Sequence, residues 1–261
     1  MKTVLITGAS SGIGEQFAHI FASKKYRVVL TARNEKKLNA LSKQLLQKYQ
    51  INTLVIPLDL GTPNGPKELY DEIQKQGIEI DVLVNNAGFG SFGYVHEQDI
   101  SEQLNLIQLN IASLTHLTML FLPDFVNKER GKILNVASTT SFYPVPLMTV
   151  YSASKAFVLS FSESLSTELK GTGVTVTALC PGNTVTGFHE RSKTENLKAI
   201  NNSTMNASMD AKKVAYIGYE ALMKGKSHVV PGLHNWTMTK LPRILPRDTV
   251  TKVTKKVLEQ T

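Results

Sequence analysis

The sequence predicts an α/β protein built on a doubly wound parallel sheet of about seven strands, with helices on both faces in a three-layer sandwich. Short apolar runs, such as 28–30 and 174–179, alternate along the chain with longer segments of helical periodicity. Continuous apolar runs are typical of parallel strands that are covered on both faces. Because strand–helix units repeat, we expect a parallel sheet with a ligand crevice beyond the carboxyl ends of its strands.

Each expected element is placed by its apolar pattern and by the turn residues around it. We expect strands at 2–6, 27–31, 52–57, 81–84, 131–137, 174–180 and 227–230. We expect helices between them at about 12–24, 34–49, 63–76, 101–127, 149–171 and 210–223. No linker, low-complexity tract or repeat divides the 261 residues. The expectation is therefore one domain over residues 1–261, with a substrate lid at about 186–209 and a basic C-terminal extension at about 231–261.

A glycine-rich turn follows the first expected strand. Residues 3–6 lead into Thr-Gly-Ala-Ser-Ser-Gly-Ile-Gly at 7–14, where an apolar helical pattern begins. A strand, a glycine turn and a helix N-terminus together aim backbone N–H groups at a phosphate. Gly8 would permit the tight turn, Gly12 the close approach of a pyrophosphate, and Gly14 close packing of helix on strand. The spacing is G-x-x-x-G-x-G, and the alternative interpretation is an ordinary loop of small residues.

Tyr151 and Lys155 are four residues apart in an expected helix, so their side chains lie on one face, about one turn apart. A free phenol has a pKa near 10, which is poorly matched to proton exchange at neutral pH. A nearby ammonium group favours the phenolate and would lower the pKa of Tyr151. The pair is therefore a candidate general acid and base for an alkoxide, although the Tyr-x-x-x-Lys pattern alone is common.

The chain resembles the short-chain dehydrogenase/reductase family over at least residues 2–230. Each motif is weak alone, but the joint order of the motifs is specific. The resemblance rests on residues 7–14, Asp59-Leu60, Asn85-Asn86-Ala87-Gly88, Asn110, Ser138, Tyr151 with Lys155, and Pro181-Gly182 with Thr186. It implies a Rossmann-type fold and a single-domain oxidoreductase that interconverts a carbonyl and a secondary alcohol by hydride transfer.

By this resemblance, four residues would form the reaction centre: Asn110, Ser138, Tyr151 and Lys155. Tyr151 would give the proton to the developing oxyanion, and Ser138 would hydrogen-bond the same oxygen. Lys155 would lower the pKa of Tyr151 and bind the nicotinamide ribose. Asn110 would hold a water molecule that connects Lys155 to solvent. The alternative interpretation is that Asn110 is a polar residue inside a helix that makes a local hydrogen bond.

The end of the second expected strand indicates the cofactor. Ala32 stands where relatives that prefer NAD carry an Asp, and Arg33 offers a planar cation to a phosphate. We therefore expect NADP(H), with a solvated loop charge as the alternative for Arg33. The resemblance implies that Asp59 faces the adenine ring and that Thr186 contacts the nicotinamide amide. The full set of expected cofactor contacts is Gly8, Ser10, Ser11, Gly12, Ile13, Gly14, Arg33, Asp59, Leu60, Asn86, Ala87, Gly88, Tyr151, Lys155, Pro181, Gly182, Thr184 and Thr186.

The sequence indicates only that the substrate is apolar. Apolar walls are expected from the lid and from Phe89, Phe92, Phe142, Tyr143, Pro144 and Leu147, although core packing explains these residues equally well. The chain ending beyond residue 227 resembles that of bacterial oxidoreductases and of long-chain 3-ketoacyl and hydroxysteroid reductases. A 3-oxoacyl thioester reductase of lipid metabolism and a catalytically silent NADP-binding regulator therefore stay open as alternatives.

Positive charge is concentrated near the C-terminus. Residues 210–261 hold ten Lys or Arg and four Asp or Glu, so +6 of the formal +8 lies there. Val250, Val253, Val257 and Leu258 form a helical apolar stripe beside lysines. Such a helix can lie on an anionic membrane, pack on a partner subunit or cover the active site. Packing on a subunit or as a lid is the favoured interpretation, ahead of peripheral membrane contact.

Composition and residue spacing narrow the remaining classes of protein. The lone Cys180 leaves no internal disulfide framework and fits a reducing compartment. No apolar run reaches the ~18 residues of a membrane span and no signal-peptide pattern opens the chain, so we expect a cytoplasmic protein. No His/Cys/Asp cluster has metal-ligand spacing, and no aromatic–basic pattern supports nucleic-acid binding. By family analogy we expect a homodimer or homotetramer that acts on a small molecule.

Overall fold

A seven-stranded parallel sheet forms the centre of the computed structural model, which describes residues 1–186 and 208–259. Neighbouring strands lie in the order β3-β2-β1-β4-β5-β6-β9, and each pair is parallel. The strands are β1 (Thr3–Thr7), β2 (Arg27–Ala32), β3 (Thr53–Pro57), β4 (Val82–Asn85), β5 (Gly131–Val136), β6 (Val174–Leu179) and β9 (His228–Val229). All seven expected strands are confirmed, each with its ends within one residue of the prediction.

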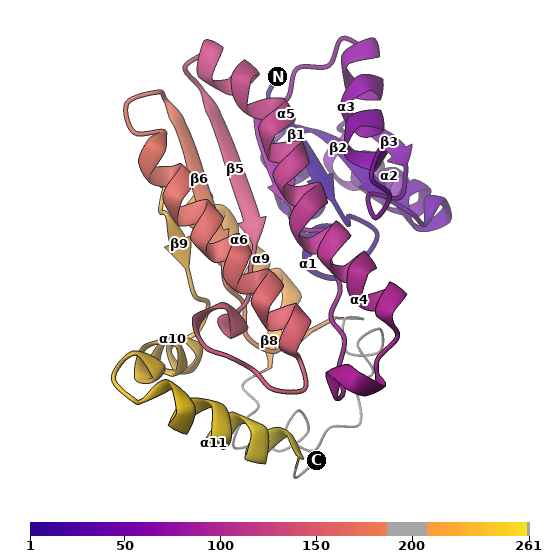
Figure 1. Ribbon diagram of the computed structural model, residues 1–261. Helices are drawn as coiled ribbons and strands as arrows, with labels where there is room; N and C mark the ends of the chain where they lie inside the picture. The colour runs from indigo at the N-terminus through magenta and orange to yellow at the C-terminus, as the bar shows by residue number, and fades with distance from the viewer. Residues whose placement is uncertain (187–207, 260–261) are drawn as a thin grey trace.

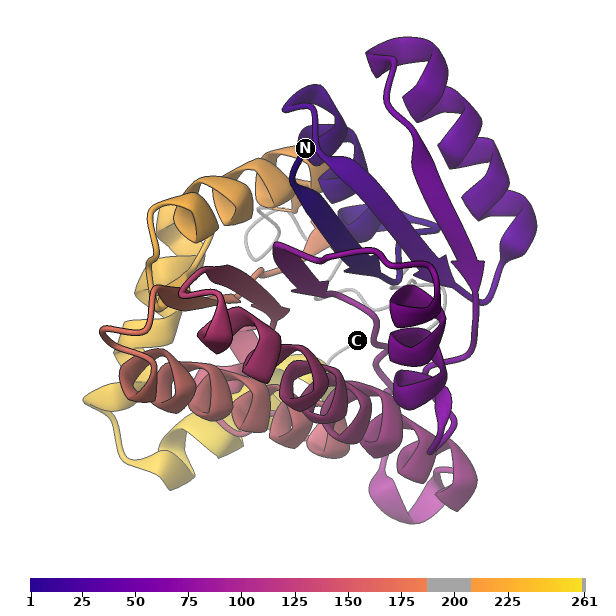
Figure 2. The same cartoon turned by 90° about the horizontal axis from the view of Figure 1, so that it is seen from above.

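Helices cover both faces of this sheet, as Figures 1 and 2 show. The helices on one face are α1 (Gly12–Ser23), α2 (Glu35–Tyr49) and α9 (Ala211–Met223), and those on the other are α3 (Gly65–Lys75), α5 (Leu114–Asn127) and α6 (Thr149–Glu168). The chain winds from β1 towards β3 in one direction and towards β9 in the other. The doubly wound, three-layer prediction is therefore confirmed.

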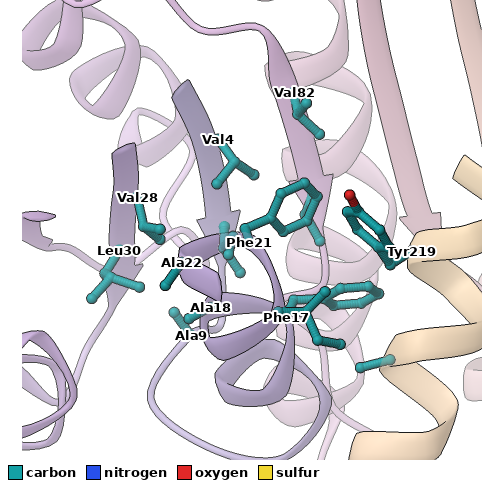
Figure 3. Close-up of a cluster of buried hydrophobic side chains, with 14 of the residues drawn as sticks. Val4, Ala9, Phe17, Ala18, Phe21, Ala22, Val28, Leu30, Val82 and Tyr219 are labelled. Atoms are coloured by element: carbon teal, nitrogen blue, oxygen red, sulfur yellow. The ribbon is translucent and has the colours of Figure 1, made fainter. Parts of the chain in front are cut away.

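The first strand shows how one segment serves both layers. Val4 packs in the cluster that contains Phe17 and Phe21 of α1, whereas Leu5 packs in the cluster on the opposite face. This alternation follows from the two-residue period of a strand. Figure 3 shows Phe17 and Phe21 beside Tyr219 of α9, and the rings of Phe21 and Tyr219 are 5.2 Å apart between centroids. The strand and helix that flank the glycine turn are thus fixed by buried contacts.

The helix expected at 101–127 is interrupted by a π-helical turn. It runs as α4 (Ile100–Ile107), the turn η2 (Gln108–Ser113) and then α5. Contrary to the sequence-based expectation, the whole segment Ile100–Asn127 is long and apolar enough to cross a membrane. Leu117, Phe121 and Phe125 of α5 pack into the core beneath the sheet, as in the core helix of a globular protein. A π turn often marks a functional site, and this one carries the buried Asn110.

The basic extension folds as two helices. These are α10 (Leu233–Lys240) and α11 (Arg247–Glu259), and they are joined through the 3-10 turn η4 (Leu241–Arg243). Figure 1 shows both helices below the end of the sheet to which the arrow of β5 points. The extension therefore lies at the carboxyl ends of the strands, where the ligand crevice of a doubly wound fold is found.

A short parallel ladder closes the base of the expected lid. Strand β7 (Thr184–Val185) pairs with β8 (Met209–Asp210). The N–H of Met209 also donates to the carbonyl of Asn183 at 2.9 Å. Two-residue strands carry no readable periodicity, so the sequence did not predict this ladder. Most of the expected lid at 186–209 lies outside the residues that the structure describes.

Candidate active site

A cleft of about 890 Å³ lies where the loops at the carboxyl ends of the strands meet. Most of the residues expected in the site line it, namely Gly8, Ser10, Ser11, Gly12, Ile13, Arg33, Asp59, Leu60, Asn86, Ala87, Gly88, Ser138, Tyr151, Lys155, Pro181, Gly182, Thr184 and Thr186. The motifs converge because parallel strands end on the same edge of the sheet. Among residues 1–186 and 208–259, no cluster of three or more His, Cys, Asp or Glu could hold a metal ion.

The turn between β1 and α1 leaves no room for a side chain at Gly8 or Gly14. Gly8 and Gly12 have left-handed backbones, with φ of +65° and +59°, which glycine adopts without steric cost. A Cβ on Gly14 would lie 2.4 Å from the Gly8 carbonyl oxygen. The Nδ2 of Asn86 donates to the carbonyls of Thr7 at 2.9 Å and of Gly8 at 3.2 Å. The turn is therefore held in a shape that fits a pyrophosphate against backbone N–H groups.

Gly14 was expected among the cofactor contacts, but it lies outside the cleft. It does not line the cleft, and its Cα faces the Gly8 carbonyl and the Asn86 side chain. The close packing of α1 on the turn requires the absence of a side chain there. The structure therefore places Gly14 behind the turn, where it supports the shape of the turn from outside the cleft.

Arg33 and Asp59 form one end of the cleft. Arg33 follows β2 and Asp59 follows β3, and Nη1 of Arg33 lies 3.9 Å from Oδ2 of Asp59. The N–H of Gly61 donates to Oδ1 of Asp59 at 2.8 Å, which orients the carboxylate. A long ion pair between half-exposed side chains is weak, so the guanidinium can turn to another anion. Ala32 lines the cleft beside them and brings no carboxylate that would repel a phosphate.

Ser138 and Tyr151 bring two hydroxyl groups together in the cleft. Ser138 directly precedes the 3-10 turn η3 (Thr139–Phe142), and its Oγ accepts a hydrogen bond from the N–H of Thr140 at 3.1 Å. Tyr151 lies in the first turn of α6. The side chains of Ser138 and Tyr151 are hydrogen-bonded to each other, and both residues are buried. The pair can therefore present two hydroxyl groups to one substrate oxygen.

Lys155 lies one helical turn beyond Tyr151. Its Nζ donates to the carbonyl of Val136 at 2.9 Å and lies 5.8 Å from the centroid of the Tyr151 ring. A Cβ on Gly88 would approach this Nζ to 3.4 Å. Lys155 thus lies between the end of β5, helix α6 and the loop after β4. That position lets its remaining donors face the cleft.

Burial has the largest effect on the pKa values of Tyr151 and Lys155. It raises the pKa of Tyr151 to about 12, although the hydrogen bond with Ser138 acts in the opposite direction. Burial also lowers the pKa of Lys155 to about 8. The pKa of Tyr151 is therefore raised, contrary to the expectation of a lowered value, because removal from water disfavours the charged form of each group. At neutral pH Tyr151 is a protonated donor, which suits a general acid.

Asn110 lies behind the cleft and does not line it. Its Oδ1 accepts from the N–H of Phe89 at 3.1 Å, and its Nδ2 donates to the Phe89 carbonyl at 3.0 Å and to Oγ of Ser154 at 3.1 Å. A Cβ on Gly88 would lie 2.8 Å from Oδ1 of Asn110. The side chain therefore clamps the loop after β4 against α6 and positions it next to the catalytic pair. The water-holding role of Asn110 stays a prediction.

The C-terminal extension forms the other wall of the cleft. Eight apolar residues of this extension line it: Met238, Leu241, Pro242, Leu245, Val250, Val253, Val257 and Leu258. The stripe predicted on α11 thus faces the active site, in agreement with one of the three placements that the sequence left open. Thr249 and Thr254 line this wall as well. The wall is therefore mostly apolar, which favours a substrate with a sizeable hydrocarbon part.

The loops after β4 and β5 contribute fewer cleft walls than the sequence suggested. Of the six loop residues expected as walls, Tyr143 lines the cleft. Phe89 and Phe142 instead pack in buried clusters. Val145 and Met148 line the cleft in addition. Apolar residues in a loop can turn to the core or to the cavity, and composition alone does not separate the two.

Contacts across the cleft hold the far end of α11. The hydroxyl of Tyr94 donates to Oε1 of Glu259 at 2.6 Å. Lys255 lies 3.3 Å from the same carboxylate and 6.0 Å from the centroid of the Tyr94 ring. Tyr94 belongs to the loop after β4, so α11 spans the cleft from the extension to the opposite loop. The sequence could not show this contact, because it joins residues that are 165 positions apart.

Comparisons with known proteins agree with this geometry. The family model of the short chain dehydrogenases matches residues 2–197. The very-long-chain 3-oxoacyl-CoA reductase-B of Danio rerio is 38% identical over 187 residues, which are 69% of this chain and 58% of that protein. The chain thus spans somewhat more than half the length of the curated relatives it matches.

Two solved structures extend the likeness to nearly the whole chain. A short-chain dehydrogenase from Sphingobium yanoikuyae in complex with NADPH is 31% identical, with a TM-score of 0.82 over 93% of this chain and 94% of that one. A bulky-bulky ketone specific alcohol dehydrogenase from Comamonas testosteroni is 29% identical, with a TM-score of 0.79 over 93% and 92%. The chain belongs to the short-chain dehydrogenase/reductase family.

Proposed function

We propose that this protein interconverts a carbonyl and a secondary alcohol with a nicotinamide dinucleotide, and that its substrate is apolar. The observation that carries the proposal is the hydrogen-bonded pair Ser138 and Tyr151 in a cleft with the glycine turn at one end and an apolar wall at the other. A nicotinamide dinucleotide, when bound, supplies or accepts the hydride. The rest of the chemistry is proton transfer and orientation by the protein.

The proton path follows from the protonation states. Burial keeps Tyr151 protonated at neutral pH, so its hydroxyl can give a proton to the oxygen of a carbonyl as negative charge develops there. The Ser138 hydroxyl is within hydrogen-bonding reach of the Tyr151 side chain and would orient the same oxygen. The ammonium group of Lys155, with its pKa lowered to about 8, supports proton transfer while it is charged. In the oxidative direction Tyr151 would take the proton back.

NADP(H) is the proposed cofactor. The support is Arg33 at the end of β2, which lines the cleft next to Ala32 and makes only a 3.9 Å ion pair with Asp59. A guanidinium binds a phosphate through two parallel hydrogen bonds. The NADPH complex of the Sphingobium yanoikuyae dehydrogenase is consistent with this choice.

A 3-oxoacyl thioester reductase is a second candidate within the same reaction. It is favoured by the apolar wall of α11, which could line a hydrocarbon chain, and by the similarity to the very-long-chain 3-oxoacyl-CoA reductase-B of Danio rerio. The other alternative, a catalytically silent NADP-binding regulator, is disfavoured because Ser138, Tyr151 and Lys155 are all present and close together. We also propose a cytoplasmic protein that assembles as a homodimer or homotetramer.

Consumption of NADPH by the purified protein tests the proposal. The substrates would be 3-oxoacyl thioesters of several chain lengths, bulky aromatic ketones, steroids, aldehydes and sugars, with NADH in parallel. Tyr151→Phe removes the donor hydroxyl, so we expect turnover to fall by at least about 1,000-fold, within the range of general acid catalysis. NADPH affinity should change by less than about threefold. Turnover at the wild-type rate in Tyr151→Phe would refute the role of Tyr151.

A further inference from the structure

Helix α10 and the turn that follows it expose five large apolar side chains within residues 233–245. Leu233 and Ile244 are 78% and 80% exposed, and Trp236, Leu241 and Leu245 are each more than two-fifths exposed. We call these five residues the apolar corner. Scattered single apolar residues are normal on a protein surface, but a cluster of large ones marks an interaction site. The corner therefore needs a partner that accepts apolar side chains.

Positively charged residues adjoin the apolar corner in the sequence. Lys240, Arg243 and Arg247 occur within eight residues, and Asp248 is the sole acidic residue of the sequence between 231 and 258. Leu233, Trp236 and Lys240 share one face of α10 because they are spaced by three and four residues. The Nζ of Lys240 lies 5.6 Å from the centroid of the Trp236 ring. Apolar and cationic groups thus occupy the same surface, which calls for an anionic partner with an apolar interior.

The apolar corner is also continuous with the cleft. Leu241 and Leu245 line the cleft, and both are exposed on the molecular surface. Val253 of α11 also lines the cleft and is also exposed on the molecular surface. The mouth of the cleft therefore has an apolar rim at the corner. An apolar molecule that entered there would not have to cross a polar surface.

We propose that the apolar corner docks on an anionic lipid bilayer. Leu233, Trp236 and Ile244 would insert among the acyl chains at the interface, where tryptophan is enriched in membrane proteins. Lys240 and Arg247 would lie at the level of the anionic headgroups. The apolar stripe of α11 faces the cleft, so the corner, and not that stripe, makes the contact. Docking would place the mouth of the cleft against the bilayer and give it access to an apolar substrate.

Trp236 makes the test direct, because it is the one tryptophan of the chain. The full-length protein would be titrated with vesicles of phosphatidylcholine alone and of phosphatidylcholine with phosphatidylglycerol, and its tryptophan emission recorded. We expect a blue shift and quenching by lipids brominated on their acyl chains, with partitioning at least about tenfold stronger on the anionic vesicles. Binding to the anionic vesicles should weaken at high salt.

Matched variants separate docking from general effects on the protein. Ile244→Glu places a charge in the apolar corner, and Leu46→Glu places one at a 48% exposed leucine of α2. We expect Ile244→Glu to weaken partitioning at least about tenfold and Leu46→Glu to leave it within about twofold. For the electrostatic part, Arg247→Glu should weaken binding to anionic vesicles only, with Lys43→Glu on α2 as its control.

Three outcomes would overturn the proposal. One is the absence of a tryptophan shift with either vesicle, and another is equal weakening by Ile244→Glu and Leu46→Glu. The third is a change of oligomeric state in Ile244→Glu without vesicles, measured by analytical ultracentrifugation, which would assign the apolar corner to contact with a second copy of the chain. Vesicle binding needs no turnover, so docking can fail while the proposed reaction stands, and the reaction can fail while docking stands.

Discussion

The two ends of the cleft are built in different ways. At the nucleotide end, backbones approach so closely that a Cβ on Gly8 would lie 2.9 Å from Cα of Ala87. At the substrate end, the wall consists mostly of apolar side chains from α11 and the segment before it. A hydrogen bond between the exposed Tyr94 and Glu259 joins α11 to the opposite loop. A side chain cannot be added at Gly8 or Gly14 without moving backbone, whereas the apolar wall can repack.

The rigid nucleotide end suits a cofactor, and the adaptable apolar end suits a substrate. A dinucleotide is the same molecule in every turnover, so a rigid backbone turn can be complementary to it. Apolar walls tolerate exchange of similar side chains at little cost, so substrate choice can change without loss of the fold. The contrast predicts large effects on cofactor affinity at one end and modest effects on substrate affinity at the other.

Gly8→Ala should show the largest effect, and Gly77→Ala is its matched control. The two glycines have nearly the same backbone, with φ of +65° and +63°, but a Cβ on Gly77 would meet nothing within 4 Å. Both variants carry a left-handed alanine, at about 1–2 kcal/mol, and only Gly8→Ala adds the contact with Ala87. We expect NADPH affinity, measured by calorimetric titration, to fall at least about 100-fold in Gly8→Ala. Equal NADPH affinities in Gly8→Ala and Gly77→Ala would show that the close backbone packing at Gly8 does not control cofactor binding.

Arg33→Gln should have the next largest effect, and it tests cofactor choice. Loss of the cation removes a charge-assisted hydrogen bond worth about 1.5–3 kcal/mol, so NADPH affinity should fall by about ten- to 100-fold. NADH affinity should change by less than about twofold. The weak ion pair with Asp59 contributes little to stability, so the melting temperature should not change.

The control for this variant is Arg27→Gln, because Arg27 begins the strand that ends one residue before Arg33. It lies at the opposite end of β2, away from the cleft, and should leave both nucleotide affinities unchanged. A fall in NADH affinity equal to that of NADPH would mean that Arg33 binds a part common to both nucleotides. The NADP(H) proposal would then lose its support.

The nucleotide end could be predicted from the sequence because its parts are local. The turn of Gly8 and Gly12 directly follows an apolar strand, and Arg33 directly follows another. Once the strands are placed, the parallel sheet brings these loops together. The sequence did not distinguish residues that line the cleft from residues that support it. Gly14 and Asn110 occur in the same motifs as the lining residues, yet both lie behind the cleft.

The substrate end could be predicted only in part. The apolar stripe of α11 was readable from its helical spacing, but its partner surface depends on Tyr94, which is 165 residues away from Glu259. The pKa of Tyr151 was also misjudged. The spacing of Tyr151 and Lys155 shows that they share a face, but burial, which raises the pKa of one and lowers that of the other, is a property of the folded chain.

Tyr94→Phe should have the smallest effect, and it tests whether the two ends act separately. The variant keeps the ring beside Lys255 and removes the hydroxyl that donates to Glu259 at 2.6 Å. An exposed hydrogen bond contributes little net free energy, so we expect the KM of an apolar ketone to rise by less than about fivefold. NADPH affinity should not change, because Tyr94 does not line the cleft near the glycine turn.

The matched control is Tyr216→Phe, which removes the hydroxyl of another exposed tyrosine, on α9 and outside this cleft. It should leave the KM and the NADPH affinity unchanged. A rise in KM for long apolar ketones with no rise for short ones would sharpen the contrast, because only long substrates reach the end of α11. A fall in NADPH affinity in Tyr94→Phe alone would mean that the position of α11 is coupled to the nucleotide end, so that the two ends of the cleft do not act separately.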